Sequence, residues 1–325
     1  MTEPRQNSRL LGHQAAVRAL HGAAAGGRLH HAWLIGGPPG IGKATLAYRF
    51  ARWLLAGGTA ADLSVPENLP AVKRFNANTH ADLLAIERRF DPKRRKMQSE
   101  IVIDTIQEAG RFLHLTPGEG GWRAVIVDGA EAMNRNAANA LLKLLEEPPK
   151  RAILLLVSHA PGRLLPTLRS RCRMLNLAPL SEAEVNTLLR DYAPGLGQAE
   201  RERLAVLSEG SIGAALALAA ENGIEIAGMV DEALNAARPL SPGRAQAIAD
   251  SLNRSEDGFS LFMNLLRAGL ARFVRQTAKD GAESARLAER VRLWQELGDL
   301  EREVENLNLD KRAAVLVALS QASGR

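Results

Sequence analysis

Residues 36–45 read GGPPGIGKAT, and this stretch decides how the first half of the chain folds. It follows an apolar run, HAWLIG at residues 31–36, and leads into a helical pattern, KATLAYRFARWLL at residues 43–55. A glycine-rich loop between a strand and a helix turns its backbone N–H groups toward one point, where they bind phosphate together with the helix N-terminus. The stretch therefore predicts a nucleotide-phosphate loop, whose binding residues are Gly37, Gly40, Gly42 and Lys43.

Further apolar runs alternate with helical patterns in the first half of the chain. ADLLAIE (residues 81–87), WRAVIVD (122–128) and RAILLLVSH (151–159) each have the length and composition of a buried strand. Helical patterns lie between them at residues 101–115 and 136–149, and two prolines end the second one. Apolar strands separated by helices are typical of a parallel sheet that is covered on both faces. We therefore predict the α/β class for this half.

The chain changes character after residue 178, because only helical patterns follow. Ser181 and Glu184 have the spacing of a capping box, which marks the start of a helix. Breaks rich in glycine and proline separate the later helices, and the long patterns near the end are typical of a helical bundle. We predict three domains: a P-loop nucleotide-binding-like domain over residues 1–178, a small helical lid over 179–222 and an all-α C-terminal domain over 223–325.

Composition limits the kinds of function that are open to the chain. It has 325 residues, a single cysteine (Cys172) and a formal net charge of +6, and 4% of its residues are aromatic. One cysteine allows no internal disulfide and argues against a zinc site, so we predict no zinc and a cytoplasmic location. The modest charge permits contact with nucleic acid without requiring it. We find no apolar run of membrane-spanning length and no signal-peptide pattern, which predicts no membrane association.

Nucleotide hydrolysis needs more than the glycine loop. It also needs a hydroxyl that holds Mg²⁺, an acid at the end of a neighbouring strand and a group that positions water. Ala44 stands where the hydroxyl belongs, and Thr45 lies about 100° further around the helix. Asp128 ends a predicted strand and either holds the metal through water or caps a helix. Gly129 stands where many motors carry the water-positioning glutamate, and the offset of Glu131 aims it elsewhere.

Four motifs, in this order, resemble the clamp-loader subunits of bacterial DNA polymerase III, which are members of the AAA+ superfamily, and in particular the delta-prime type. They are HAWLIGGPPGIGKAT (31–45), GGWRAVIVDGAEAMNRNAANALLKLLEEPP (120–149), LRSRC (168–172) and EGSIGAAL (209–216). NLNLDKRAAVLVAL (306–319) extends the resemblance more weakly. The resemblance implies an AAA+ P-loop domain with a parallel sheet, followed by a small helical lid and an all-α collar that holds subunits together.

The resemblance also implies a role for the SRC triplet, which corresponds to Ser170, Arg171 and Cys172. In clamp loaders the arginine of this triplet projects into the ATP site of the neighbouring subunit. Arg171 would therefore be a catalytic arginine finger that acts in trans, since a planar cation from a neighbour can stabilise charge on a transferred phosphoryl group. The alternative is that this arginine belongs to a solvated basic face or a salt bridge.

Two further positions differ from those of the ATPase subunits. The lid of those subunits carries a nucleotide-sensing arginine, and Gly213 stands in its place. A phosphate-sensing Thr or Asn follows their last strand, where this chain has SHA at residues 158–160. Together with Ala44 and Gly129, these differences predict hydrolysis near background. Gly37, Gly40, Gly42, Lys43, Thr45 and Asp128 would then form a degenerate nucleotide site that binds ATP or ADP only passively, with no metal and no required cofactor.

We therefore expect a delta-prime-like, ATPase-silent scaffold that supplies Arg171 to a neighbouring ATPase subunit and helps to load the sliding clamp on primed DNA during replication. The implied partners are the gamma/tau ATPase subunits and the delta subunit. The sliding clamp would be contacted indirectly, and primed DNA through the assembled complex.

Two other functions stay open from the sequence. An active AAA+ ATPase, either a gamma/tau-like motor or another remodelling enzyme, would need Thr45 and Glu131 to replace the missing groups. A small-molecule kinase is disfavoured, because no acceptor-binding motif is apparent. The basic run from Arg88 to Lys96 is also open to two interpretations: it contacts DNA phosphates, or it forms a solvated hairpin.

Overall fold

The computed structural model describes residues 3–91, 96–119, 121–236, 238–255, 257–279 and 284–323. Contacts within the chain divide it into two compact units. The first comprises Met1–Leu196 and Ser208–Ala214, and the second comprises Gly197–Leu207 and Ala215–Arg325. The finer division into a lid and a collar, with boundaries at residues 179 and 223, stays a prediction.

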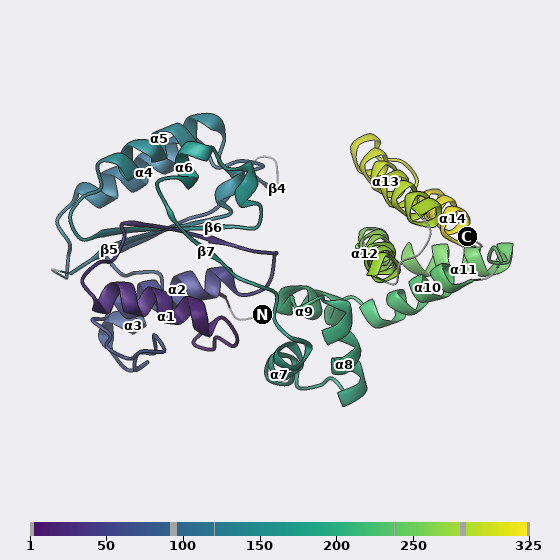
Figure 1. Cartoon of the computed structure of the whole chain (residues 1–325), viewed down its shortest axis with the longest axis horizontal. Helices are drawn as coiled ribbons and strands as arrows, with labels where there is room; N and C mark the ends of the chain where they lie inside the picture. Colours follow the sequence, from purple (N-terminus) through teal and green to yellow (C-terminus); the bar gives the residue numbers. More distant parts are fainter. Residues whose placement is uncertain are drawn as a thin grey trace. The chain divides into compact units, whose positions relative to one another are not determined.

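Five of the described strands form one parallel sheet in the first unit, in the order β2-β5-β6-β1-β7 (Figure 1). Their bounds are Leu83–Ile86 (β2), Arg123–Asp128 (β5), Ala152–Ser158 (β6), Ala32–Gly36 (β1) and Arg173–Asn176 (β7). All residues of β1 and β6 are buried, as expected of central strands covered on both faces. The register pairs Gly36 with Ser158 and Asn176, so the glycine loop leaves the sheet at its carboxyl edge.

The helices of the first unit are α1 (Gln14–Ala25), α2 (Lys43–Leu55), α3 (Pro70–Asn76), α4 (Ile103–His114), α5 (Arg135–Glu146), α6 (Pro166–Arg169) and α7 (Glu182–Tyr192). Shorter elements join them: the antiparallel pair β3 (Phe90–Asp91) and β4 (Lys96–Met97), and the 3-10 turns η1 (Ala130–Ala132) and η2 (Pro161–Arg163). α7 begins with the predicted capping box, because the side chain of Ser181 accepts a hydrogen bond from the backbone N–H of Glu184 while the Glu184 carboxylate accepts one in return.

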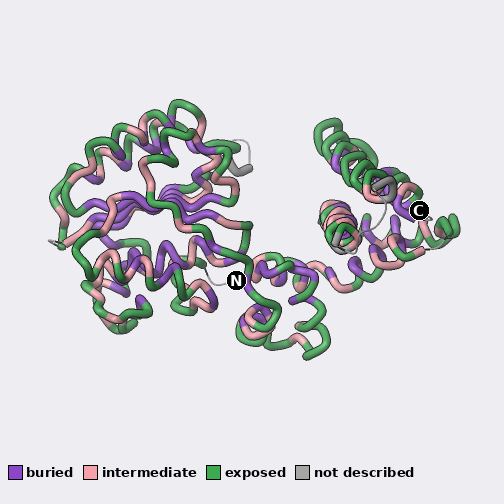
Figure 2. Tube along the Cα trace, viewed as in Figure 1, coloured by how far each residue is buried: buried purple, intermediate pink, exposed green. Residues whose placement is uncertain are grey.

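Helices lie on both faces of the sheet, and each face has its own hydrophobic core (Figures 1 and 2). On the face of α1, α2 and α3, Phe50 packs with Trp33 and Ile35 in one core. On the face of α4, α5 and α6, Leu141 packs with Leu34 in the other. Successive side chains of β1 enter opposite cores because a strand alternates its side chains between its two faces. The predicted α/β class is confirmed.

Helices joined by short turns make up the described residues of the second unit. Its helices are α8 (Gln198–Leu207), α10 (Gly223–Asn235), α11 (Pro242–Leu252), α12 (Gly258–Lys279), α13 (Ser284–Leu307) and α14 (Lys311–Ala322), together with most of α9 (Ile212–Ala220), which begins in the first unit. α12 packs against both α10 and α13, and Phe262, Leu266 and Leu297 are fully buried. The prediction of an all-α C-terminal part is confirmed.

One pair of helices in this region is unusually apolar. Across the described residues, no single helix is long and apolar enough to span a membrane. α9 and α10 reach that length and apolarity only when they are taken together, and a bend of 95° separates them. Both helices carry buried side chains, including Leu218 of α9 and Val230 of α10.

Candidate functional site

The glycine loop lies where the sequence predicts it, between β1 and α2. Gly37, Gly40 and Gly42 have φ angles of 146°, 71° and 100°. Glycine reaches such positive angles readily, whereas residues with a side chain rarely do. Gly42 is the N-cap of α2, so Lys43 is the first residue of the helix. The strand–loop–helix context of a phosphate-binding loop is therefore present.

Lys43, the cation of the loop, is turned onto the loop's own backbone. The residue is 5% exposed, and its Nζ atom donates a hydrogen bond of 2.5 Å to the carbonyl oxygen of Pro38. Burial lowers the pKa of Lys43, while the nearby carboxylates of Asp128 and Glu131 act in the opposite direction. A phosphate group would have to compete with the Pro38 carbonyl for this ammonium group.

The turn that opens α9 packs directly on the glycine loop. The backbone N–H of Gly213 donates a hydrogen bond of 3.0 Å to the carbonyl oxygen of Gly40. A Cβ atom at Gly213 would lie 2.9 Å from the Cα atom of Gly40, and a Cβ atom at Gly40 would lie 2.3 Å from the Oγ atom of Ser211. The first contact is with backbone, so the close approach requires glycine at position 213. The second is with the end of a side chain, and at Gly40 the positive φ angle adds to the preference for glycine. Gly213 is also the position where the sequence resemblance predicts that a nucleotide-sensing arginine is missing.

The N-terminal segment, residues 7–13, lies against the other side of the loop. The side chain of His13 is hydrogen-bonded through Nε2 to the carbonyl oxygen of Ile41 at 2.7 Å. The Tyr192 hydroxyl, at the end of α7, donates a hydrogen bond of 3.1 Å to the Oδ1 atom of Asn7. The loop is thus bonded to residues on both sides of it, from segments far apart in the sequence.

Thr45 borders a small cavity of about 30 Å³ between the loop, the N-terminal segment and α7. The side chains of Leu180, Tyr192 and Ile212 also line it. Small-molecule sites commonly have volumes of roughly 300–1,000 Å³, and a single water needs about 10–15 Å³. In this arrangement, the space beside Thr45 does not fit a nucleotide.

Asp128 ends β5, as predicted, and lies near Lys43. Burial raises the pKa of Asp128, and the Glu87 carboxylate adds to this, while a hydrogen bond from the Gly129 backbone and the charges of Lys43 and His159 oppose it. The alternative prediction, that Asp128 caps a helix, is wrong. The N-cap of η1 is Gly129, and Asn134 caps α5 by accepting a hydrogen bond from the next turn.

The side chains of Glu131 and His159 meet beside this acid. The Oε1 atom of Glu131 lies 2.6 Å from Nε2 of His159, and the Glu131 side chain is 9% exposed. Its second oxygen, Oε2, has no hydrogen-bond partner among the described residues. The offset of Glu131 therefore aims it at His159, the residue after β6, and the Glu131 carboxylate also acts on Lys43. No three metal-binding side chains within the described ranges lie close enough to hold a metal ion.

Arg171 lies in the turn between α6 and β7, and its side chain is 38% exposed. Its Nη2 atom forms an ion pair with Oε1 of Glu146 at 2.7 Å, and its Nη1 atom donates a hydrogen bond of 3.1 Å to the carbonyl oxygen of Thr167. Ser170 donates to the same carbonyl through its hydroxyl. The guanidinium is therefore held at two points while part of it faces solvent.

The neighbours of Arg171 have separate structural roles. Cys172 packs against the core beneath α4 and α5, and burial raises the pKa of its thiol to about 12. Such a thiol is protonated near neutral pH and is a poor nucleophile. The guanidinium of Arg173 lies over the ring of Trp33, 5.0 Å from its centroid. Arg169 is exposed, and its side chain forms no hydrogen bond or ion pair with any residue that the structure describes.

A family model described as "DNA polymerase III, delta subunit" matches residues 12–181. The match covers more than half of the chain and includes the glycine loop, Asp128 and Arg171. The chain belongs to the DNA polymerase III delta-subunit family. The resemblance that the four sequence motifs indicate is therefore confirmed at the level of the family.

Individual relatives agree with the family assignment. The chain is 41% identical over 190 residues to the delta' subunit of DNA polymerase III from Pseudomonas aeruginosa, covering 57% of this chain and 55% of that protein. It is 38% identical over 192 residues to the delta' subunit from Escherichia coli, covering 59% and 55%. The tau subunit from Escherichia coli is 29% identical over 222 residues, covering 66% and 32%. The chain thus spans about half the length, or less, of the curated relatives it matches.

Solved structures resemble the chain only distantly. A gamma subunit-related protein from Thermotoga maritima is 20% identical, covers 97% of this chain and 100% of its own, and has a TM-score of 0.41. A RuvB mutant from the same organism is 18% identical, covers 78% and 87%, and has a TM-score of 0.43. At such low identities and TM-scores, these structures say nothing about the site of this chain.

The basic run lies only partly within the described residues. Arg89 forms an ion pair of 2.6 Å with Glu108 of α4. On either side of the remaining residues, β3 pairs with β4 in antiparallel register. Residues 92–95, which include Lys93, Arg94 and Arg95, lie outside the described residues, so contact with DNA stays a prediction.

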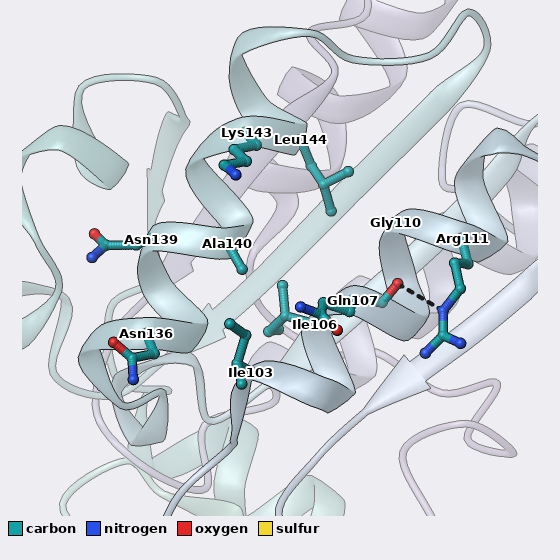
Figure 3. A pocket seen from close by; sticks show the side chains of 10 residues that line it. All are labelled: Ile103, Ile106, Gln107, Gly110, Arg111, Asn136, Asn139, Ala140, Lys143 and Leu144. Atoms are coloured by element: carbon teal, nitrogen blue, oxygen red, sulfur yellow. Dashed lines mark hydrogen bonds between the residues drawn. The ribbon is translucent and has the colours of Figure 1, made fainter.

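A groove of about 700 Å³ runs between α4 and α5, on the face of the sheet opposite α2 (Figure 3). Its lining residues recur at intervals of three and four along each helix, so one face of α4 and one face of α5 border it. Gly110 and Ala140 leave room at its centre, while Asn136, Asn139 and Lys143 stand along α5. None of the predicted site residues lines this groove, so it is separate from the glycine loop.

We predict that Gly213→Ala destabilises the first unit by about 1–3 kcal/mol, because the added methyl group pushes against the backbone of Gly40. Unfolding in urea, followed by tryptophan fluorescence, to which the buried Trp33 of the first unit contributes, measures this change. The matched control is Gly22→Ala, an exposed position in α1 with open space around it, which should be stabilised by about 0.5–1 kcal/mol. A Gly213→Ala variant as stable as the control would disprove the close contact.

We predict that Asp128→Asn gains stability over the wild type as the pH rises. The pKa of Asp128 is raised in the folded chain, so folding favours its protonated form, and this contribution is lost as the pH rises through the folded pKa. Urea midpoints of the two proteins between pH 4 and pH 8 test this. Asp62→Asn is the control: hydrogen bonds from Ser64 lower the pKa of Asp62, so its carboxylate stays charged and its difference from the wild type should not change between pH 5 and pH 8. A difference for Asp128→Asn that does not change with pH would refute the prediction.

Proposed function

We propose that this chain is a subunit of a DNA polymerase III clamp loader that hydrolyses little or no ATP and supplies Arg171 to the ATP site of a neighbouring subunit. Membership of the delta-subunit family and the similarity to delta' proteins support the proposal that the chain belongs to a clamp-loader complex. The observation that carries the silent role is the packing of Gly213 against the glycine loop. This contact occupies the side of the loop that a sensing arginine would otherwise approach.

Three features support the absence of hydrolysis. Ala44 and Gly129 offer no oxygen ligand for Mg²⁺ and no carboxylate for water. Lys43 is bonded to Pro38, and the cavity beside Thr45 is too small for a nucleotide. Glu131, which the alternative of an active ATPase would need, is already paired with His159. Any ATP or ADP would bind only after these contacts open, and the role in the assembly requires no cofactor.

The surroundings of Arg171 support a role outside its own domain. Its guanidinium is partly exposed and held at two points, so little side-chain entropy is left to lose when a phosphate binds. An arginine that enters a neighbour's site makes hydrolysis depend on correct assembly. We propose gamma/tau ATPase subunits as the neighbours that receive it, the delta subunit as a further partner, and the helical second unit as the part that holds the ring. Contact with the sliding clamp would be indirect, and contact with primed DNA would be made through the complex.

We predict that Arg171→Ala lowers ATP hydrolysis in a complex reconstituted with gamma/tau and delta subunits. The site that receives the arginine should slow by about 10³-fold, because the charge on the transferred phosphoryl group loses its stabilising cation. Phosphate release measures the rate, and native mass measurement shows whether the complex still assembles.

Arg169→Ala is the matched control, because Arg169 is an exposed arginine two residues away that forms no recorded side-chain bond within the described residues. A complex that carries Arg169→Ala should hydrolyse ATP at the wild-type rate. A wild-type rate with Arg171→Ala, in a complex of correct mass, would rule out the finger.

We predict that the isolated chain, mixed with ATP, Mg²⁺ and primed DNA, turns over far more slowly than about 1 s⁻¹, the lower end of ordinary enzyme rates. Its own pocket lacks the groups that hold the metal and orient water. The variant Lys43→Ala controls for contaminating ATPases, because only hydrolysis by this chain should depend on the loop lysine. A rate of about 1 s⁻¹ that Lys43→Ala abolishes would show that the chain is an active ATPase.

A further inference from the structure

The ion pair between Glu146 and Arg171 joins two segments that the sequence motifs treat separately. Glu146 is the last residue of α5 and belongs to the LLEEPP run, whereas Arg171 belongs to the SRC triplet. Their side chains meet at 2.7 Å and are 51% and 38% exposed. Because α5 packs against α6, the two segments are held at a fixed separation on one face of the sheet.

Within α5, the position of Glu146 is electrostatically unfavourable for a carboxylate. The C-terminal end of a helix carries partial negative charge, which repels an acid in the last turn and favours a cation. α5 nevertheless ends with Glu146, and its next residue is also an acid, Glu147. Pro148 and Pro149 then prevent the helix from continuing. The cation that compensates Glu146 is Arg171.

Two acceptors fix the plane of the guanidinium. Glu146 takes an N–H of Nη2, and the Thr167 carbonyl takes an N–H of Nη1. A guanidinium carries more N–H donors than these two contacts use, so donors remain for phosphate oxygens. One acceptor alone would leave the side chain free to rotate about its long stem.

We propose that Glu146 is a positioning residue for Arg171. Its carboxylate, together with the Thr167 carbonyl, holds the guanidinium in the orientation that meets the phosphates of the nucleotide bound by the neighbouring subunit. This inference rests on the proposed function of Arg171 in trans. Exposed ion pairs contribute little to folding stability, so the effect of Glu146 falls on the geometry of the finger and not on the fold.

The experiment uses the complex reconstituted with gamma/tau and delta subunits. ATP hydrolysis is measured for the wild type and for Glu146→Gln, Arg171→Ala and the double variant. Glu146→Gln keeps the size and an acceptor oxygen but removes the charge, and Glu146→Asp tests rescue by a shorter carboxylate. Glu147→Gln is the matched control, since Glu147 is an adjacent exposed acid whose side chain forms no recorded bond within the described part of the chain.

We expect Glu146→Gln to lower kcat at the receiving site by about two- to five-fold with an unchanged KM for ATP, as befits the loss of one exposed charge contact. Glu146→Asp should recover part of this loss, and Glu147→Gln should match the wild type. In the Arg171→Ala background, Glu146→Gln should have no further effect, because the two residues act through one group. Complex mass and urea midpoints should stay at their wild-type values.

The possible failures are distinguishable. If Arg171→Ala slows hydrolysis but Glu146→Gln does not, or if Glu146→Gln speeds it, the positioning role is wrong while the finger stands. An equal effect of Glu146→Gln with and without Arg171, or a lowered urea midpoint, would make Glu146 a purely structural residue. If Arg171→Ala has no effect, the proposed function and this inference fall together.

Discussion

The backbone contact between Gly40 and Gly213 is the constraint on which the rest of the site depends. Neither residue has room for a side chain, since added carbon atoms would lie 2.9 Å and 2.3 Å from their nearest neighbours. The contact brings the start of α9 onto the glycine loop, and the N-terminal segment then closes the other side through His13. A loop bonded on both sides keeps its curled backbone without a ligand, which explains why it retains the glycines of a binding site.

The two principal cations of the first unit consequently face different surroundings. Lys43 lies inside the loop, where burial lowers its pKa and the carbonyl oxygen of Pro38 accepts a hydrogen bond from its ammonium group. Arg171 lies outside the sheet on a turn, partly exposed and anchored by Glu146 and Thr167. Burial therefore weakens the first cation, whereas two acceptors hold the second in place while it stays partly exposed.

Most of the fold follows from local patterns in the sequence. The apolar runs give the strands, the glycine loop gives the β1–α2 junction, and the capping box gives the start of α7. Those signals lie within a few residues of each other. The pairs that define the site are different: Glu131 with His159, and Gly40 with Gly213, are distant in sequence and meet only through the sheet and the α9 turn. The sequence indicates Gly213 as a missing arginine but not as a residue required by packing, and nothing local reveals the partners of His159 or Glu146.

Gly129 places a further backbone constraint on the site. It follows Asp128 with a φ of 74°, in a region of backbone conformation that costs an ordinary residue about 1–2 kcal/mol. A glutamate at this position would therefore carry a conformational cost in the folded chain, whatever it did for the positioning of water. The backbone after β5 disfavours the side chain that such a role would need.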